Sequence, residues 1–214
     1  MMPEADVRRS RLCLVTPYDI DPDELAPRVD DALAGGDVAS LIIAGGSEHL
    51  QRLAEALVPR AQARGVAALV HNDTRIAGRA HADGVHVDSG IPDLSAAVQK
   101  LRPKMIVGAG GVRSRHEAMT AGEADPDYLF FGRLDGDTED DIFHKALDLA
   151  AWWSSVFVIP AIVMGGRTIA SVETAAREGI EFVALSRAVF DDPRGAAEAV
   201  AEANLRLGRM AESP

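Results

Sequence analysis

The chain has 214 residues, 47% of them hydrophobic, which is enough for one substantial core. Its formal net charge of −11 argues against nucleic acid or an anionic membrane surface as a partner. No apolar stretch reaches the roughly 18 residues that suggest a membrane span. The single cysteine, Cys13, excludes an internal disulfide and indicates a reducing compartment, so we expect a cytoplasmic protein.

Short apolar runs alternate with helical patterns along the whole chain. The runs lack polar alternation, which is typical of strands that are buried on both faces. In chain order they cover residues 12–16, 38–45, 66–71, 84–87, 105–110, 128–132, 158–165 and 182–186. The helical stretches 47–65 and 171–179 each close on a charged residue and then a glycine, Gly65 or Gly179, where a helix should stop.

Eight such units without a linker predict an α/β fold, a single (β/α)8 TIM barrel formed by residues 1–214. We expect residues 1–10 and 207–214 to be frayed termini. The alternative is an open doubly wound sheet. Eight repeats, and the absence of a glycine-rich dinucleotide fingerprint after the first run, count against that alternative.

Two strand ends near the C-terminus carry groups that suit an anion. Gly165 and Gly166 follow the seventh run, and Ser186 and Arg187 follow the eighth. In barrels a phosphate site often forms from these two loops, and Thr168 could cap the next helix. A tight turn and a solvated surface charge are the alternative interpretation, and a carboxylate ligand would use the same donors. Together the two loops predict a phosphate site.

Three segments resemble thiamine phosphate synthase and its TenI-like relatives. They are "HNDTRIAGRAHADGVHV", "YLFFG" and "IPAIVMGGRTIASVETAAREGIEFVALSRAVFDDPRGA". The likeness begins at "LCLVT", covers nearly the whole chain and keeps the order of the pieces. It implies a (β/α)8 barrel, often a homodimer. It also implies a transferase in which a thiazole nitrogen displaces pyrophosphate from a pyrimidine pyrophosphate with the help of Mg²⁺.

The resemblance also implies roles for individual residues. Asn72 would contact the pyrophosphate and Asp73 would help to hold magnesium, which prefers hard oxygen ligands. The second magnesium aspartate has no clean match, and Asp88 and Asp93 are both candidates. The product phosphate of a small phosphorylated metabolite would lie on Gly165, Gly166, Ser186 and Arg187.

Two histidines extend the possible metal site. His71 precedes the Asn-Asp pair, and His86 ends the fourth run. With Asp73 and Asp88 they could form a metal cluster at the barrel mouth. A histidine at a strand end is more often a packing residue, which is the alternative interpretation.

Several polar groups of the family have no counterpart here. The family's second strand ends in a Gln-Leu-Arg-x-Lys motif, for which this chain offers Leu41, Ile43 and Gly45. Gly110 stands where the family has a small hydroxyl residue after its fifth strand. The chain therefore lacks polar groups that would bind the substrates of the full synthase reaction.

The loop after the sixth run is acidic where the family has a Thr-x-Thr-Lys group. It offers Asp137, Glu139 and Asp140, which reverse the sign of the field at a leaving pyrophosphate. As a local pattern these acids predict the start of a helix, with Asp137 or Thr138 as its cap. Arg133 stands where TenI-like isomerases use a histidine.

Three functions remain open at this level. The first is a thiamine phosphate synthase-like enzyme, and the second is a non-catalytic or repurposed paralogue that binds a small phosphorylated metabolite. The third is a different phosphosugar-type barrel enzyme that shares only the anion site. Arg113, Arg115 and His116 could serve the third, although the same residues also look like a helix start.

Overall fold

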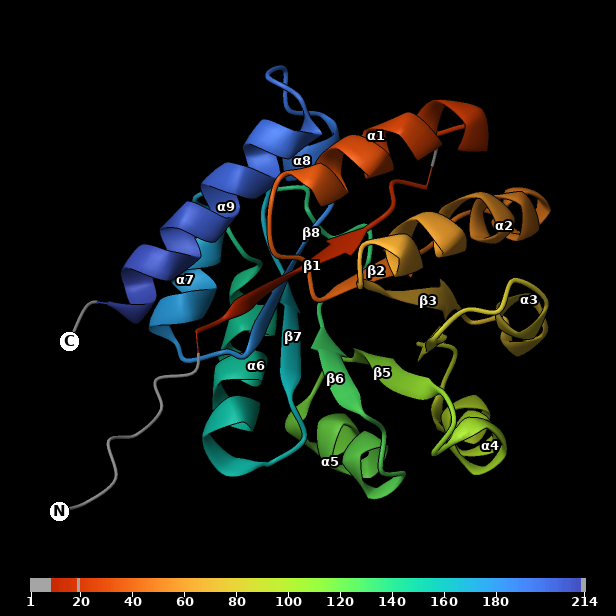
Figure 1. Ribbon diagram of the computed structural model, residues 1–214. Helices are drawn as coiled ribbons and strands as arrows, with labels where there is room; N and C mark the ends of the chain where they lie inside the picture. Colours follow the sequence, from red (N-terminus) through yellow and green to blue (C-terminus); the bar gives the residue numbers. More distant parts are fainter. Residues whose placement is uncertain (1–8, 19, 213–214) are drawn as a thin grey trace, which may run out of the picture.

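The computed structural model describes residues 9–18 and 20–212 (Figure 1). Eight parallel strands form a closed barrel in sequence order, and β8 pairs with β1 through Cys13 and Ala184. This closure confirms the predicted (β/α)8 barrel and excludes the open sheet. The strands are β1 (Arg11–Val15), β2 (Ser40–Ile43), β3 (Ala67–His71), β4 (Gly84–Val87), β5 (Ile106–Val112), β6 (Tyr128–Phe131), β7 (Ala161–Met164) and β8 (Phe182–Leu185).

Helices follow the strands and cover the outside of the barrel (Figure 1). They are α1 (Pro22–Ala34), α2 (Ser47–Ala63), α3 (Thr74–Arg79), α4 (Ile91–Leu101), α5 (Arg115–Glu123), α6 (His144–Val156), α7 (Ser171–Arg177), α8 (Arg187–Phe190) and α9 (Ala196–Ala211). The predicted glycine stops are confirmed for α2 and α7. Gly65 and Gly179 follow these helices with φ of 71° and 70°, a conformation that costs glycine little.

Alternation along each strand builds two apolar layers. On β1, Leu12 and Leu14 belong to the layer between barrel and helices, whereas Cys13 and Val15 belong to the barrel interior. Both layers are buried, which is why the strands read as continuous apolar runs. The interior is filled by side chains and is closed below the carboxyl ends of the strands.

The chain near both ends is more ordered than the sequence predicted. Ser10 is buried and its hydroxyl donates to the Ile180 carbonyl over 2.6 Å. The frayed C-terminus is wrong for 207–211, since α9 runs to Ala211 and Leu207 is 1% exposed. The physical reason is the packing of α9 against α1 and α7. Residues 1–8 and 213–214 lie outside the described part.

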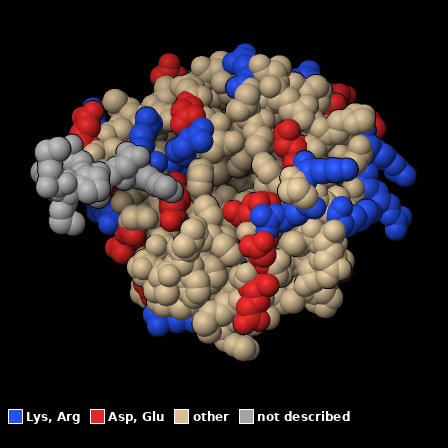
Figure 2. Space-filling model, turned by 60° about the horizontal axis from the view of Figure 1, so that its bottom comes forward, with Lys and Arg blue, Asp and Glu red and all other residues tan. Residues whose placement is uncertain are grey.

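The surface mixes charges of both signs. On the face in Figure 2, acidic side chains lie between basic ones, and much of the surface comes from uncharged residues. Among the described residues, no helix is long and apolar enough to cross a membrane.

Candidate functional site

A cavity of about 760 Å³ opens at the carboxyl ends of the strands. We call it the mouth pocket. Loops after β1, β4, β5 and β6 line it, together with the first turns of α6. Its wall is partly apolar, with Leu134, Phe143 and Met164, and Tyr18 and Asp88 supply polar groups. A concave, mixed surface of this size suits a small organic ligand.

Three cations reach this pocket from the β5 and β6 side. They are Arg113, Arg133 and Lys145. Arg133 pairs with Asp135 over 2.7 Å and is largely exposed. Within the described residues, the side chains of Arg113 and Lys145 form no ion pair with a carboxylate. They are therefore available to an anionic ligand. The sequence suggested Arg113 for a ligand but gave no reason to select Lys145.

Asp88 is the centre of a polar cluster at the pocket wall. Its Oδ1 accepts from His71 Nε2 over 2.9 Å and from Asn72 Nδ2 over 2.7 Å. The Asp88 amide in turn donates to Asn72 Oδ1 over 2.9 Å. Asn72 adopts φ of 55°, a left-handed conformation that asparagine tolerates better than most residues. The amide predicted to contact pyrophosphate is thus used to hold Asp88.

Tyr18 extends this cluster into a chain that can carry a proton. Because Asp88 is an acceptor, His71 Nε2 carries the hydrogen, and Nδ1 accepts from the Tyr18 hydroxyl at 3.4 Å. Burial raises the pKa of Tyr18 to about 12, and the charges of Asp88 and Asp135 add to this. Burial also raises the pKa of Asp88, but donors from His71 and Asn72 outweigh it and bring the pKa to about 2.

His86 lies below this cluster in the barrel interior. It is 1% exposed, and its Nδ1 forms a hydrogen bond of 3.0 Å with the Tyr128 hydroxyl. Burial, together with nearby His71, lowers its pKa to about 3. A Cβ atom at Gly110 would lie 2.6 Å from His86 Nε2 and 3.1 Å from Asp88 Cβ. The glycine that replaces the family's hydroxyl residue therefore makes room for this cluster.

The two residues predicted to hold magnesium, Asp73 and Asp88, accept hydrogen bonds from different parts of the protein. Asp73 caps α3, and its Oδ1 accepts from the amides of Arg75 and Ile76, both over 2.9 Å. Asp88 accepts from two side chains instead. Over residues 9–18 and 20–212, no group of three or more His, Cys, Asp or Glu side chains is placed to hold a metal. The predicted His-Asp metal cluster therefore does not form, because local donors already use both carboxylates.

The glycine loop after β7 comes together with the loop after β8, as predicted. However, protein acceptors already occupy its amides. The Gly165 amide donates to the Ala184 carbonyl over 2.8 Å, and the Gly166 amide donates to Ser171 Oγ over 3.0 Å. Thr168 does not cap α7, because its hydroxyl donates to the Asp140 carbonyl over 2.8 Å.

The predicted helix start after β6 is wrong. Helix α6 begins only at His144, and residues 137–141 instead cross to the loops after β7 and β8. Asp137 is 2% exposed, and its Oδ2 accepts from the Arg187 amide over 2.7 Å. Burial raises the pKa of Asp137, and the Arg187 amide opposes that rise. We call Asp137–Asp141 the acidic segment.

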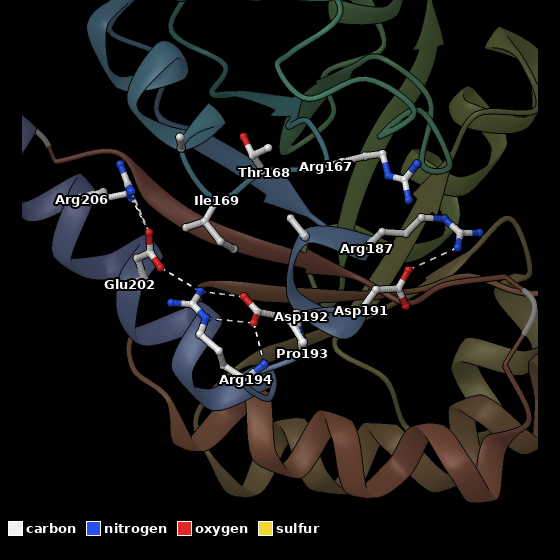
Figure 3. A pocket seen from close by; sticks show the side chains of 12 residues that line it. Arg167, Thr168, Ile169, Arg187, Asp191, Asp192, Pro193, Arg194, Glu202 and Arg206 are labelled. Carbon is white, nitrogen blue, oxygen red and sulfur yellow. Dashed lines mark hydrogen bonds and ion pairs between the residues drawn. The ribbon is translucent and has the colours of Figure 1, made fainter.

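Arg187 does not line the mouth pocket. It lines a second cavity of about 370 Å³ beside α7, α8 and α9, which we call the flank pocket (Figure 3). Arg187 Nη1 lies 3.4 Å from Asp191 Oδ2, and Arg167 extends toward the same side (Figure 3). Arg194 in the same pocket pairs with Asp192 and with Glu202. Most of the charge in this pocket is thus paired within the protein.

On β2, the inward-facing positions near the mouth differ from those assigned by the resemblance. Leu41 and Ile43 pack in the outer layer, against the helices. Ile42 in this strand and Ala44 directly after it face the interior near the mouth. A side chain must face the interior to reach a ligand at the mouth, and these two offer no polar group.

Two of the residues suggested for a phosphosugar substrate lie elsewhere. Arg115 begins α5, and its guanidinium lies 4.8 Å from the centre of the Trp152 ring. His116 follows in the same helix and does not line the mouth pocket. The predicted helix start is confirmed, since Ser114 Oγ accepts from the Glu117 amide over 3.2 Å.

The fold is that of a TIM barrel with an open pocket at the carboxyl ends of its strands. The sequence profile of thiamine monophosphate synthase matches residues 12–189, and the chain belongs to this family.

Individual relatives agree with this assignment. The thiamine-phosphate synthase of Rhodospirillum centenum is 33% identical, with 91% of this chain and 96% of that protein covered. The thiamine-phosphate synthase of Erythrobacter litoralis is 37% identical, covering 90% and 94%. Among solved structures, a thiamine phosphate pyrophosphorylase from Pyrococcus furiosus superposes with a TM-score of 0.76 at 19% identity, covering 95% and 98% of the two chains.

Proposed function

We propose that the protein binds a small phosphorylated metabolite of thiamine biosynthesis in the mouth pocket. The ligand classes that fit are thiazole phosphate and thiamine phosphate. The observation that carries this proposal is the pocket itself, which combines about 760 Å³ of space, an apolar wall and three cations. An aromatic ring can lie on the apolar wall while the phosphate meets the cations.

The ligand's phosphate would meet Arg113 and Lys145. Both line the pocket, and within the described part of the chain neither is paired with a carboxylate. A hydrogen bond to a charged group is worth about 1.5–3 kcal/mol, so each cation should contribute roughly tenfold or more to affinity. Membership of the thiamine phosphate synthase family supports this class of ligand.

The full synthase reaction is less well supported. A leaving pyrophosphate needs donors and cations aimed at its developing charge. On the β2 side, the interior positions Ile42 and Ala44 are apolar. Asn72, which would contact the pyrophosphate, is hydrogen-bonded to Asp88. These features favour a paralogue that binds the phosphorylated ligand without coupling the two substrates.

Isothermal titration with thiamine phosphate and thiazole phosphate tests the binding. We expect saturable binding to the wild type and at least a tenfold loss in Lys145→Gln and in Arg113→Gln. Lys104→Gln is the matched control, because Lys104 precedes β5 at the opposite end of the barrel. If the wild type binds neither compound, the proposal is wrong. Thiamine phosphate production from both substrates and Mg²⁺ would show that the synthase reaction has survived.

One observation favours a second candidate, a different barrel enzyme that moves a proton. Tyr18 and Asp88 line the mouth pocket, and His71 joins them. A ligand proton can pass to the Tyr18 oxygen while the Tyr18 proton passes to His71 Nδ1, and Asp88 stabilises the resulting imidazolium. Exchange of a ligand C–H with deuterated solvent, followed by NMR, should then occur and be lost in Tyr18→Phe. If exchange persisted in Tyr18→Phe, the hydrogen-bonded residues Tyr18, His71 and Asp88 would not be its cause.

A further inference from the structure

The acidic segment lies directly on the glycine loop after β7. The Arg167 amide donates to the Glu139 carbonyl over 2.7 Å, and the Thr168 amide donates to the Asp140 carbonyl over 3.2 Å. At Gly166, a Cβ atom would lie 2.3 Å from the Asp140 carbonyl oxygen. Only a glycine at 166 permits this approach. The segment thus packs directly on this loop at Gly166.

Asp137 makes the equivalent contact with the loop after β8. Its carboxylate is buried, and Oδ2 lies 2.7 Å from the Arg187 amide nitrogen, which donates to it. This geometry is the one that a phosphate oxygen would adopt at a backbone amide. The two residues are 50 positions apart in the chain. A negatively charged side chain of the protein therefore occupies the place that the sequence predicted for a ligand's phosphate.

The acidic segment also forms part of the mouth pocket. Thr138 and Glu139 line that pocket, while Asp137 and Asp140 bond to the loops after β7 and β8. The segment is therefore a partition between the mouth pocket and the two loops. A ligand in the mouth pocket contacts the same few residues that hold the loops closed.

We propose that the acidic segment is an internal ligand of the loops after β7 and β8, with the Asp137 carboxylate in place of a ligand phosphate. While the segment is docked, the Arg187, Arg167 and Thr168 amides reject phosphate, because acceptors of the segment occupy them and Asp137 adds a like charge. Phosphate can bind to them only when the segment leaves. This inference rests on the proposed function only in that the same mouth admits the ligand.

Phosphate affinity of Asp137 variants tests the inference. Inorganic phosphate is titrated into the Arg113→Gln/Lys145→Gln protein, so that the pocket cations do not contribute. We expect phosphate to bind at least tenfold more tightly when Asp137→Ala is added than to this parent protein, because the Arg187 amide is released and the charge is removed. Asp140→Asn is the matched control. It removes one charge from the same segment, but only the Asp140 backbone carbonyl bonds to the loops, so it should bind no better than its parent.

Hydrogen exchange of the wild type provides a test that does not depend on a variant folding. The Arg187 and Arg167 amides should be protected in the free protein, and in Asp137→Ala the Arg187 amide should exchange at least tenfold faster. Rapid exchange of both amides in the wild type would overturn the proposal, as would equal phosphate binding with and without Asp137. If thiamine phosphate fails to bind to the wild type while Asp137→Ala gains phosphate binding, the proposed function fails and the internal ligand stands.

Discussion

Removing His86 should change the pH dependence of stability in a way that can be calculated. The ordinary pKa of histidine is about 6.5. Burial lowers the pKa of His86 to about 3 in the folded protein. The unfolded chain therefore binds one more proton than the folded protein between these two values. The stability that this residue contributes is present above pH 6.5 and is lost as the pH falls toward 3.

The slope of that loss follows from proton linkage. One proton bound only by the unfolded state lowers the free energy of unfolding by about 1.4 kcal/mol for each pH unit. From pH 7.5 to pH 5.5 the wild type should lose about 1.4 kcal/mol through His86, and a further 1.4 kcal/mol or so down to pH 4.5. These losses are a substantial part of the roughly 5–15 kcal/mol that stabilises a typical domain.

Urea unfolding at several pH values measures this slope in the wild type and in His86→Gln. The variant should be less stable at neutral pH, because it disturbs the bond to Tyr128, but its curve against pH should be flatter. His144→Gln removes an exposed histidine from α6 and should keep the slope of the wild type. If the wild type and His86→Gln curves ran parallel, His86 would accept a proton in the folded protein, and the assignment of a neutral, buried imidazole would be refuted.

Three further predictions concern packing, backbone conformation and metal. Gly108→Ala should lower stability by about 1–3 kcal/mol in thermal unfolding, because its Cβ would lie 1.9 Å from Tyr128 Cζ. Gly78→Ala, with open space at its Cβ in α3, should be neutral or stabilising. Asn72→Ala should cost more than Asn72→Gly by about 1 kcal/mol, because only glycine adopts φ of 55° freely; equal losses would attribute the effect to the bonds with Asp88 alone. Mg²⁺ without a phosphorylated ligand should leave the unfolding midpoint unchanged, and a rise would reveal a preformed metal site.

The barrel and its helices could be read from the sequence because their causes are local. Continuous apolar runs such as 12–16 pack on both faces, and glycine at 65 and 179 ends a helix through its own conformational freedom. The family could be recognised for a related reason, since its motifs are short and keep their order along the chain.

The sequence located the residues of the polar site, but it did not predict which of them bond to one another. Asp73 and Asp88 were predicted to hold magnesium and Asn72 to contact the pyrophosphate, yet Asp73 is used by the amides of its own helix. Asn72 and His71 meet Asp88 because β3 and β4 are paired, with His71 opposite His86. Which donor bonds to a carboxylate depends on this pairing of strands. The hydrophobic periodicity of the sequence does not predict it.

The acidic segment shows most clearly how tertiary contacts can override a local sequence pattern. Its residues alone favour a helix start, and they were predicted as one. In the folded protein the amides of Arg187, Arg167 and Thr168 lie within reach, and they satisfy the acceptors of Asp137, Glu139 and Asp140. The sequence by itself determined the barrel, its family and the two loops that suit an anion. Only the tertiary structure decided that the Asp137 carboxylate meets the Arg187 amide in the second of these loops, because donor and acceptor come from segments that meet only when the barrel closes.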